Sequence, residues 1–156
     1  IIPAHAGNVT SHAQPLLAIL INKKKASIMH TCRVLLVDDH VPIRITLKRL
    51  LATYENVYVV GEACDGKQAI ELVPLYRPNV VLMDFYMPRM SGPDAARIMK
   101  QSWQEIAIIG ICTSFNEYIA DAFLKAGASA VVPKDKVDDL HSTMNEIVRR
   151  QSTQFC

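Results

Sequence analysis

The sequence predicts an α/β fold built on a parallel sheet with helices on both faces. From residue 32 onward, short apolar runs occur without the polar alternation that a half-exposed strand shows. Each run is followed by a segment whose apolar residues recur at helical intervals, so strands and helices alternate along the chain. This alternation is typical of a doubly wound parallel sheet, and 156 residues suit one such domain with a substantial core.

The first part of this chain contains two expected strand–helix pairs. Arg33–Val37 predicts a buried strand, and Pro42–Thr53 predicts a helix because proline fits the first helical turn. The β-branched segment Val57–Ala63 predicts the second strand. Asp65 is a suitable N-cap for a helix that we expect at Lys67–Leu75.

The second part continues the alternation to the end of the chain. Val80–Asp84 predicts a third strand, and a loop with proline and glycine separates it from a helix expected at Pro93–Ser102. Ile106–Thr113 predicts the fourth strand. The remaining expected elements are a helix at Ser114–Ala126 that Gly127 ends, a strand at Ala130–Val132 and an amphipathic helix at Val137–Arg150.

Residues 1–28 differ from the rest because they show no sustained period. We interpret them as an N-terminal extension, added or upstream, and residues 29–156 as the domain, with Met29 as the natural start. The alternative is a native N-terminal helix at Gln14–Lys25. The longest apolar run, Leu16–Ile21, is far shorter than the ~20 residues of a membrane span, so no membrane association is expected.

The charge and the cysteines narrow the class of protein. A formal charge of +2 predicts no strong attraction to nucleic acid or to membrane surfaces. The four cysteines are far apart and form no C-x-x-C pair, so neither a zinc ribbon nor a redox motif is indicated. Reduced thiols in a cytoplasmic protein are favoured, although an even count leaves disulfides open.

Polar residues follow the expected strands where each strand ends. Asp38 and Asp39 follow the first, Asp84 ends the third, Thr113 ends the fourth and Lys134 follows the fifth. The carboxyl ends of parallel strands share one edge of the sheet, where such folds bind their ligands. These five side chains are therefore expected to meet.

The expected group of side chains indicates a site for a cation and a phosphoryl group. Three nearby carboxylates raise one another's pKa unless a cation neutralises them, and Mg²⁺ combines carboxylate, water and phosphate ligands. An ammonium such as that of Lys134 and a hydroxyl such as that of Thr113 bind phosphate oxygens. Because no Ser-His or Cys-His pair is expected nearby, a carboxylate is the expected phosphoryl acceptor.

The segment from Arg33 to Arg150 resembles the receiver domain of bacterial two-component response regulators, especially the NarL/LuxR type. The matching text is VLLVDDHVPIR, VVGEACDGKQAIEL, RPNVVLMDFYMPRMSG and KAGASAVVPKD. The resemblance implies a flavodoxin-like (βα)5 fold with strand order 2-1-3-4-5. It also implies phosphorelay signalling, with a sensor histidine kinase as the phosphodonor.

The resemblance implies a role for each residue of the site. Asp84 would be the phosphoacceptor, Lys134 would contact the phosphoryl group, and Thr113 would turn toward it. Magnesium would be bound by Asp39 directly, by Asp38 mainly through water, by Asp84, and by the backbone carbonyl of Tyr86. His40, beside the acidic pair, is interpreted as a loop residue rather than as a metal ligand.

Two positions depart from the family's pattern. Val131 stands where many receivers carry an aromatic residue that swings inward, so the response is expected to depend on Thr113 and loop movement. Pro133 precedes Lys134, whereas many receivers have proline after this lysine, often with a cis bond. If Pro133 redirects Lys134, Lys136 is the alternative lysine.

The leading hypothesis is a phosphorylation-dependent switch rather than a conventional enzyme. Phosphorylation would alter the surface of residues 114–126, 130–132 and 137–150, and thereby the affinity for a partner or for a second copy. DNA would be bound only through an output domain outside this sequence, as in a transcriptional regulator; a stand-alone receiver is the alternative.

Two other classes compete with this hypothesis. The first is an interaction module with the same fold that is not phosphorylated, which the intact acidic residues disfavour. The second is an enzyme on a similar sheet. An aspartate-nucleophile phosphatase expects its first two aspartates one residue apart, and a dinucleotide-dependent reductase expects a glycine-rich turn that DHVPIR lacks.

Overall fold

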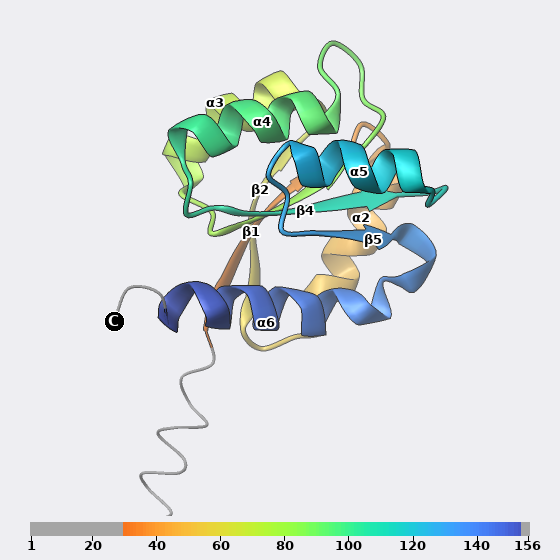
Figure 1. The fold of residues 1–156 in the computed structure, drawn as a ribbon. Helices are drawn as coiled ribbons and strands as arrows, with labels where there is room; N and C mark the ends of the chain where they lie inside the picture. The colour runs from red at the N-terminus through yellow and green to blue at the C-terminus, as the bar shows by residue number, and fades with distance from the viewer. Residues whose placement is uncertain (1–29, 154–156) are drawn as a thin grey trace, which may run out of the picture.

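The computed structural model describes residues 30–153, which form a five-stranded parallel sheet (Figure 1). The strand order is β2-β1-β3-β4-β5, which confirms the predicted order 2-1-3-4-5. The strands are β1 Cys32–Val37, β2 Val57–Ala63, β3 Val80–Asp84, β4 Ala107–Cys112 and β5 Ala130–Pro133.

Helices cover both faces of the sheet, with α3, α4 and α5 on one side and α2 and α6 on the other (Figure 1). They are α2 Val41–Leu51, α3 Gly66–Tyr76, α4 Gly92–Ser102, α5 Glu117–Lys125 and α6 Asp138–Thr153, with a short 3-10 turn η1 at Lys134–Lys136. The doubly wound α/β architecture is therefore as predicted.

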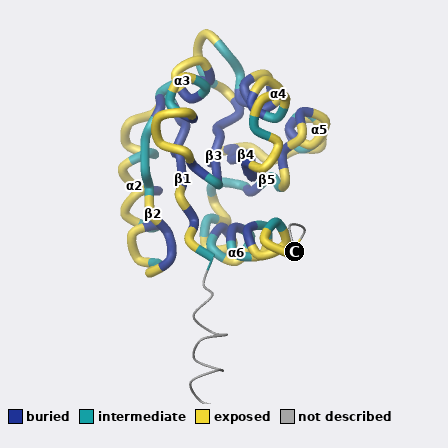
Figure 2. Tube along the Cα trace, turned by 90° about the vertical axis from the view of Figure 1, so that its left-hand side faces the viewer, coloured by how far each residue is buried: buried dark blue, intermediate teal, exposed yellow. Residues whose placement is uncertain are grey.

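The central strands are buried on both faces, which explains why their text is apolar without alternation. In β1, Leu35 and Val37 pack with the α3–α5 layer, and Val34 and Leu36 pack with the α2–α6 layer. Figure 2 shows buried residues along β1, β3 and β4, whereas the helices are buried only on their inner sides. Two apolar layers thus hold the sheet in place and leave its carboxyl edge available for polar groups.

Helix boundaries follow the capping side chains. Asp65 is the N-cap of α3, as predicted, and its Oδ1 accepts from the Gln68 amide at 2.9 Å. Helix α5 begins at Glu117 rather than at Ser114, because Asn116 accepts from the Ile119 amide at 2.9 Å. Residues 114–116 therefore form a loop after β4, and this part of the predicted helix was wrong.

Two other boundaries bear on the site and on the chain ends. Thr113 lies directly after β4 rather than inside it, and Gly127, with φ +91°, ends α5 as predicted. The extension at residues 1–28, the proposed start Met29 and the alternative helix Gln14–Lys25 lie outside the described residues. Within residues 30–153, no helix combines the length and hydropathy that crossing a membrane requires.

Candidate functional site

The ends of β1 and β3 lie side by side because these two strands are paired in parallel. Val37 is in register with Met83, so Asp38 and Asp84 come next to each other at the carboxyl edge. Both side chains are withdrawn from solvent: Asp38 is 0% exposed and Asp84 is 5% exposed. Two carboxylates in such a place require a cation, since burial and mutual repulsion both disfavour their charge.

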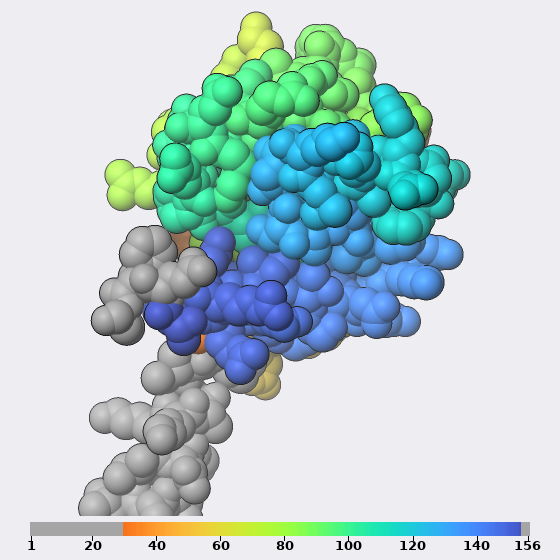
Figure 3. Space-filling view, in the orientation of Figure 1, coloured from red at the N-terminus to blue at the C-terminus, as the bar shows by residue number. Residues whose placement is uncertain are grey.

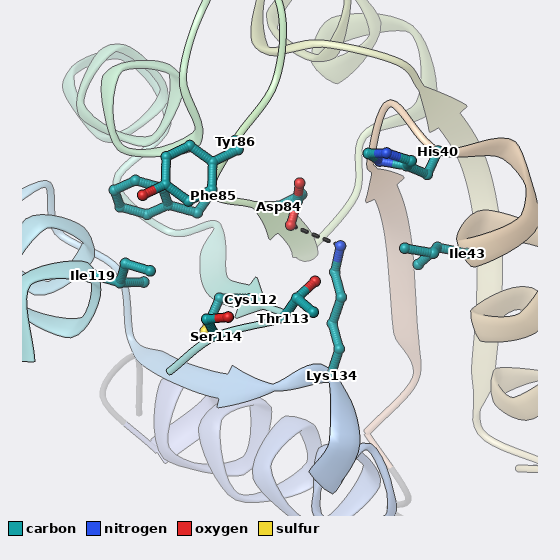
Figure 4. A pocket seen from close by; sticks show the side chains of 10 residues that line it. All are labelled: His40, Ile43, Asp84, Phe85, Tyr86, Cys112, Thr113, Ser114, Ile119 and Lys134. Carbon is teal, nitrogen blue, oxygen red and sulfur yellow. Dashed lines mark ion pairs between the residues drawn. The ribbon is translucent and has the colours of Figure 1, made fainter. Parts of the chain in front are cut away.

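Lys134 supplies a positive charge to both carboxylates. Its Nζ lies 2.6 Å from Asp38 Oδ2 and 2.8 Å from Asp84 Oδ1. Figure 4 shows the side chain extending from the end of β5 to Asp84. Pro133, which pairs with Cys112 at the last position of the β4–β5 ladder, does not turn Lys134 away from these carboxylates. Lys136 is exposed in η1 and is not the lysine that contacts these carboxylates.

The environment changes the pKa of both Asp84 and Lys134. Burial raises the pKa of Asp84, Lys134 opposes this rise, and the nearby charge of Asp38 adds to it. Burial also disfavours the charged form of Lys134, but its hydrogen bonds with Asp38 and Asp84 prevail and raise its pKa. The lysine is therefore fully charged at neutral pH and favours the ionised form of Asp84.

Asp84 opens into a cavity of about 230 Å³ (Figure 4). The predicted residues Thr113, Lys134 and Tyr86 line it together with Asp84. The lining is His40, Ile43, Asp84, Phe85, Tyr86, Cys112, Thr113, Ser114, Ile119 and Lys134. The Thr113 side chain lines the same cavity as Asp84 and Lys134, so a group bound to Asp84 would have the Thr113 hydroxyl nearby (Figure 4).

Asp39 and His40 form the rim of the same edge. Asp39 Oδ1 is buried and accepts no hydrogen bond from the described residues, and His40 Nδ1 lies 2.8 Å from it. The His40 amide donates to Asp38 Oδ1 at 2.8 Å, which holds the Asp38 carboxylate in place. One ligand atom each of Asp38, Asp39 and His40 lies within 4.8 Å of the others.

A family model described as the response regulator receiver domain matches residues 34–145. The chain belongs to this family. The receiver is 36% identical over 119 residues to the transcriptional regulatory protein YdfI of Bacillus subtilis (strain 168), a match that covers 75% of this chain and 55% of that protein. These matches confirm the resemblance stated from the sequence motifs.

Solved receiver domains have the same fold. The receiver domain of NarL from Mycobacterium tuberculosis matches with 34% identity and a TM-score of 0.63, covering 77% of this chain and 92% of that one. The response regulator domain of CheB from Thermotoga maritima matches with 25% identity and a TM-score of 0.71, covering 77% of this chain and 98% of that one. The flavodoxin-like fold is therefore shared with known receivers.

The curated relatives are longer than this receiver. The match spans 55% of YdfI and 44% of the transcriptional regulatory protein DegU of Brevibacillus brevis. Another relative, a protein-glutamate methylesterase/protein-glutamine glutaminase of Geobacter metallireducens, is 37% identical over 105 residues, which span 30% of it. Because transcriptional regulators and an enzyme both carry a receiver, the receiver itself fits a regulatory unit rather than an enzyme.

The acidic edge of this receiver fits a hard divalent cation. Asp38 and Asp39 offer carboxylate oxygens that lie within 4.8 Å of one another and of a His40 ring nitrogen, whereas Asp84, at the end of the paired strand, is outside this group of described residues. The buried Asp39 Oδ1 accepts no hydrogen bond from the described residues. Oxygen ligands of this kind suit Mg²⁺, which retains several waters and also binds phosphate oxygens. The donor set is therefore consistent with the predicted magnesium site.

Sequence reasoning missed one residue that contacts the acidic edge. Arg44, in the first turns of α2, donates from Nη1 to the backbone carbonyl of Asp38 at 2.6 Å. Its Nε also lies 3.4 Å from Glu62 Oε2 on β2. The matching text VLLVDDHVPIR ends at this arginine, but the contact itself could not be predicted from the text, because it depends on how α2 lies across β1 and β2. Its place in this motif, five residues after Asp39, was the signal that the sequence offered.

Proposed function

We propose that this receiver accepts a phosphoryl group on Asp84 from a phosphohistidine of a sensor histidine kinase, in the presence of Mg²⁺. The observation that carries the proposal is the pair of contacts from Lys134 Nζ to Asp38 and Asp84. A half-buried lysine between two buried carboxylates supports a site for added negative charge at Asp84. The 230 Å³ cavity beside Asp84 gives the group room.

The proposed reaction is an in-line transfer. A carboxylate oxygen of Asp84 attacks phosphorus, the bond from phosphorus to the donor imidazole nitrogen breaks, and the imidazole keeps that electron pair. Asp38, Asp39, Asp84 and the backbone carbonyl of Tyr86 would hold Mg²⁺, which supplies neutralisation of phosphoryl charge. Lys134 binds a phosphoryl oxygen and favours the ionised form of Asp84 before the attack.

The proposed output is a change of the surface that includes α5, β5 and α6. Thr113 lies between the site and α5, so movement of its hydroxyl toward the phosphoryl group shifts the loop at residues 114–116. Figure 3 shows α4, α5 and α6 next to one another on a single face. A second copy or a partner that binds this face in one of the two conformations would bind with a different affinity once phosphorylation shifts the equilibrium between them.

The wider setting is also part of the proposal. The relatives named as transcriptional regulators support regulation of transcription, with DNA bound by an output domain outside these residues. The free thiols of Cys32, Cys64 and Cys112 support a reducing, cytoplasmic location.

Intact-mass measurement tests the proposal. The chain incubated with Mg²⁺ and a small phosphodonor such as acetyl phosphate should gain one phosphoryl group, and Asp84→Asn should gain none. Asp94→Asn, at an exposed aspartate on α4, is the matched control and should gain the group as wild type does. No gain in wild type, or an undiminished gain in Asp84→Asn, would instead favour an interaction module that is not phosphorylated.

A further inference from the structure

Asp65 is a buried carboxylate outside the acidic site. It is 1% exposed. Among the described residues, the other buried polar or charged ones are Asp38 and Asp84, which belong to the site, and Asn56. Asp65 Oδ1 caps α3 by accepting from the Gln68 amide at 2.9 Å. Capping uses one oxygen and explains a polar residue here, but an asparagine or serine would cap as well. The negative charge requires a separate explanation.

Arg89 is the cation that pairs with this charge. Its Nη2 donates to Asp65 Oδ2, so the two carboxylate oxygens hold different segments of the chain. Arg89 belongs to the loop between β3 and α4, which begins directly after Asp84. It has φ +66°, a left-handed conformation that is unfavourable for an arginine and that the surrounding contacts must maintain.

The same loop is fixed at two further points. At its base, the Gly92 amide donates to the Phe85 carbonyl at 3.1 Å. Beside Arg89, Met90 lies against Gly66, where an added Cβ would be 3.0 Å from Met90 Cγ and 3.1 Å from Met90 O. The N-terminus of α3, at Asp65 and Gly66, therefore contacts Arg89 and Met90 of the loop.

We propose that the Asp65–Arg89 ion pair is a positioning device for the metal ligands of the site. The loop that this ion pair holds carries Tyr86, whose backbone carbonyl is a proposed Mg²⁺ ligand. The loop begins directly after Asp84. This inference rests on the proposed function and extends it to two residues that do not touch the metal or the phosphoryl group. Without the pair, the carbonyl is no longer held at the acidic edge and Mg²⁺ binds more weakly.

Four variants separate positioning from capping and from general stability. Asp65→Asn keeps the cap on α3 and removes the charge, and Arg89→Met removes the cation but keeps most of the side-chain stem. Arg89→Lys retains a positive charge that can reach Asp65. Arg97→Met, which breaks the exposed Arg97–Asp94 pair on α4, is the matched control.

Calorimetric titration with Mg²⁺ alone gives the deciding readout, the dissociation constant. We expect the dissociation constant to rise roughly tenfold in Asp65→Asn and in Arg89→Met. Loss of a residue that orients metal ligands weakens metal binding by roughly 10–100-fold, and this expectation is the lower end of that range. Arg89→Lys and Arg97→Met should stay close to wild type. The double variant Asp65→Asn/Arg89→Met should show the same rise in the dissociation constant as either single variant. Because it leaves no unpaired buried charge, it can still be measured if a single variant is too unstable.

Equal dissociation constants in wild type, Asp65→Asn and the double variant would overturn the inference, whatever happens to thermal stability. Phosphorylation of the same proteins by acetyl phosphate keeps this result distinct from failure of the proposed function. If wild type is phosphorylated on Asp84 and the affinities are equal, only the positioning role fails. If wild type neither binds Mg²⁺ nor is phosphorylated, both fail.

Discussion

Lys134 Nζ lies 2.8 Å from Asp84 Oδ1, so its side chain reaches along the carboxyl edge of the sheet from the end of β5 to the end of β3. The lysine follows β5 and the aspartate ends β3, with β4 between them. The length of the lysine side chain allows it to span this intervening strand and also to reach Asp38. One side chain thus connects the ends of β1, β3 and β5.

Removing this lysine should destabilise the Mg²⁺-free protein. Lys134→Ala leaves Asp38 and Asp84 without their cation, and we expect a loss of about 3 kcal/mol in the free energy of unfolding. Lys136→Ala is the control, because Lys136 is exposed, and should change stability little. Urea denaturation measures both. A larger loss in Lys136→Ala would assign the role to Lys136.

The raised pKa of Asp84 predicts a pH dependence of stability. Between its ordinary value of 3.8 and its higher folded value, the folded state binds more protons than the unfolded state, so this group stabilises the fold less as pH rises. In Mg²⁺-free buffer, Asp84→Asn should therefore be more stable than wild type at neutral pH. The difference should shrink as pH falls through the folded pKa toward 3.8 and stay small below it, where Asp84 is protonated in both states.

Chemical denaturation of both proteins across this pH range checks the sign. A wild type that gains stability relative to Asp84→Asn as pH rises would show that the folded pKa is lowered instead. The predicted direction follows mainly from burial of the carboxyl group, which outweighs the opposing effect of Lys134.

The N-cap of α5 should contribute measurably to stability. Asn116→Ala removes the acceptor of the Ile119 amide and should lower the free energy of unfolding by about 1 kcal/mol. Asn116→Asp retains a side-chain acceptor and should stay near wild type. Equal stability of the alanine and aspartate variants would show that the cap does not hold this helix end.

The Thr113 hydroxyl should be needed for the response but not for phosphorylation. Thr113→Val removes the hydroxyl with little change in size, so Asp84 should still gain its phosphoryl group. NMR shift changes in α5 on phosphorylation should become much smaller than in wild type. Thr143→Val, on α6, is the control and should keep them. Undiminished shifts in Thr113→Val would indicate a response that bypasses this residue.

The sequence was sufficient to predict the sheet and the gathering of its polar ends. β2 and β3 have the predicted bounds, because each is a compact run rich in apolar or β-branched residues; Asp65 follows the first closely and Asp84 ends the second. Asp38 and Asp84 were expected to be neighbours because parallel strands end at one edge, and β1 and β3 are indeed paired. The spacing of apolar residues predicts the strands, and the parallel topology predicts that their polar ends meet, so neither prediction requires knowledge of side-chain contacts.

Contacts between loops could not be predicted in this way. Asp65 was recognised as a cap, but its pairing with Arg89 depends on the left-handed backbone at Arg89, which no periodicity signals. The start of α5 was placed too early because apolar spacing alone does not show which of several polar residues caps the helix. The choice between Lys134 and Lys136 likewise required the register of Pro133 on β5.

Diffraction from crystals grown with Mn²⁺ in place of Mg²⁺ tests the central claim most directly, because the anomalous signal locates the ion. The account predicts one strong peak about 2–2.5 Å from carboxylate oxygens of Asp39 and Asp84 and from the backbone carbonyl of Tyr86. A peak elsewhere on the molecule with this edge empty, or contact with only one of these residues, would contradict the shared metal site on which phosphorylation of Asp84 depends.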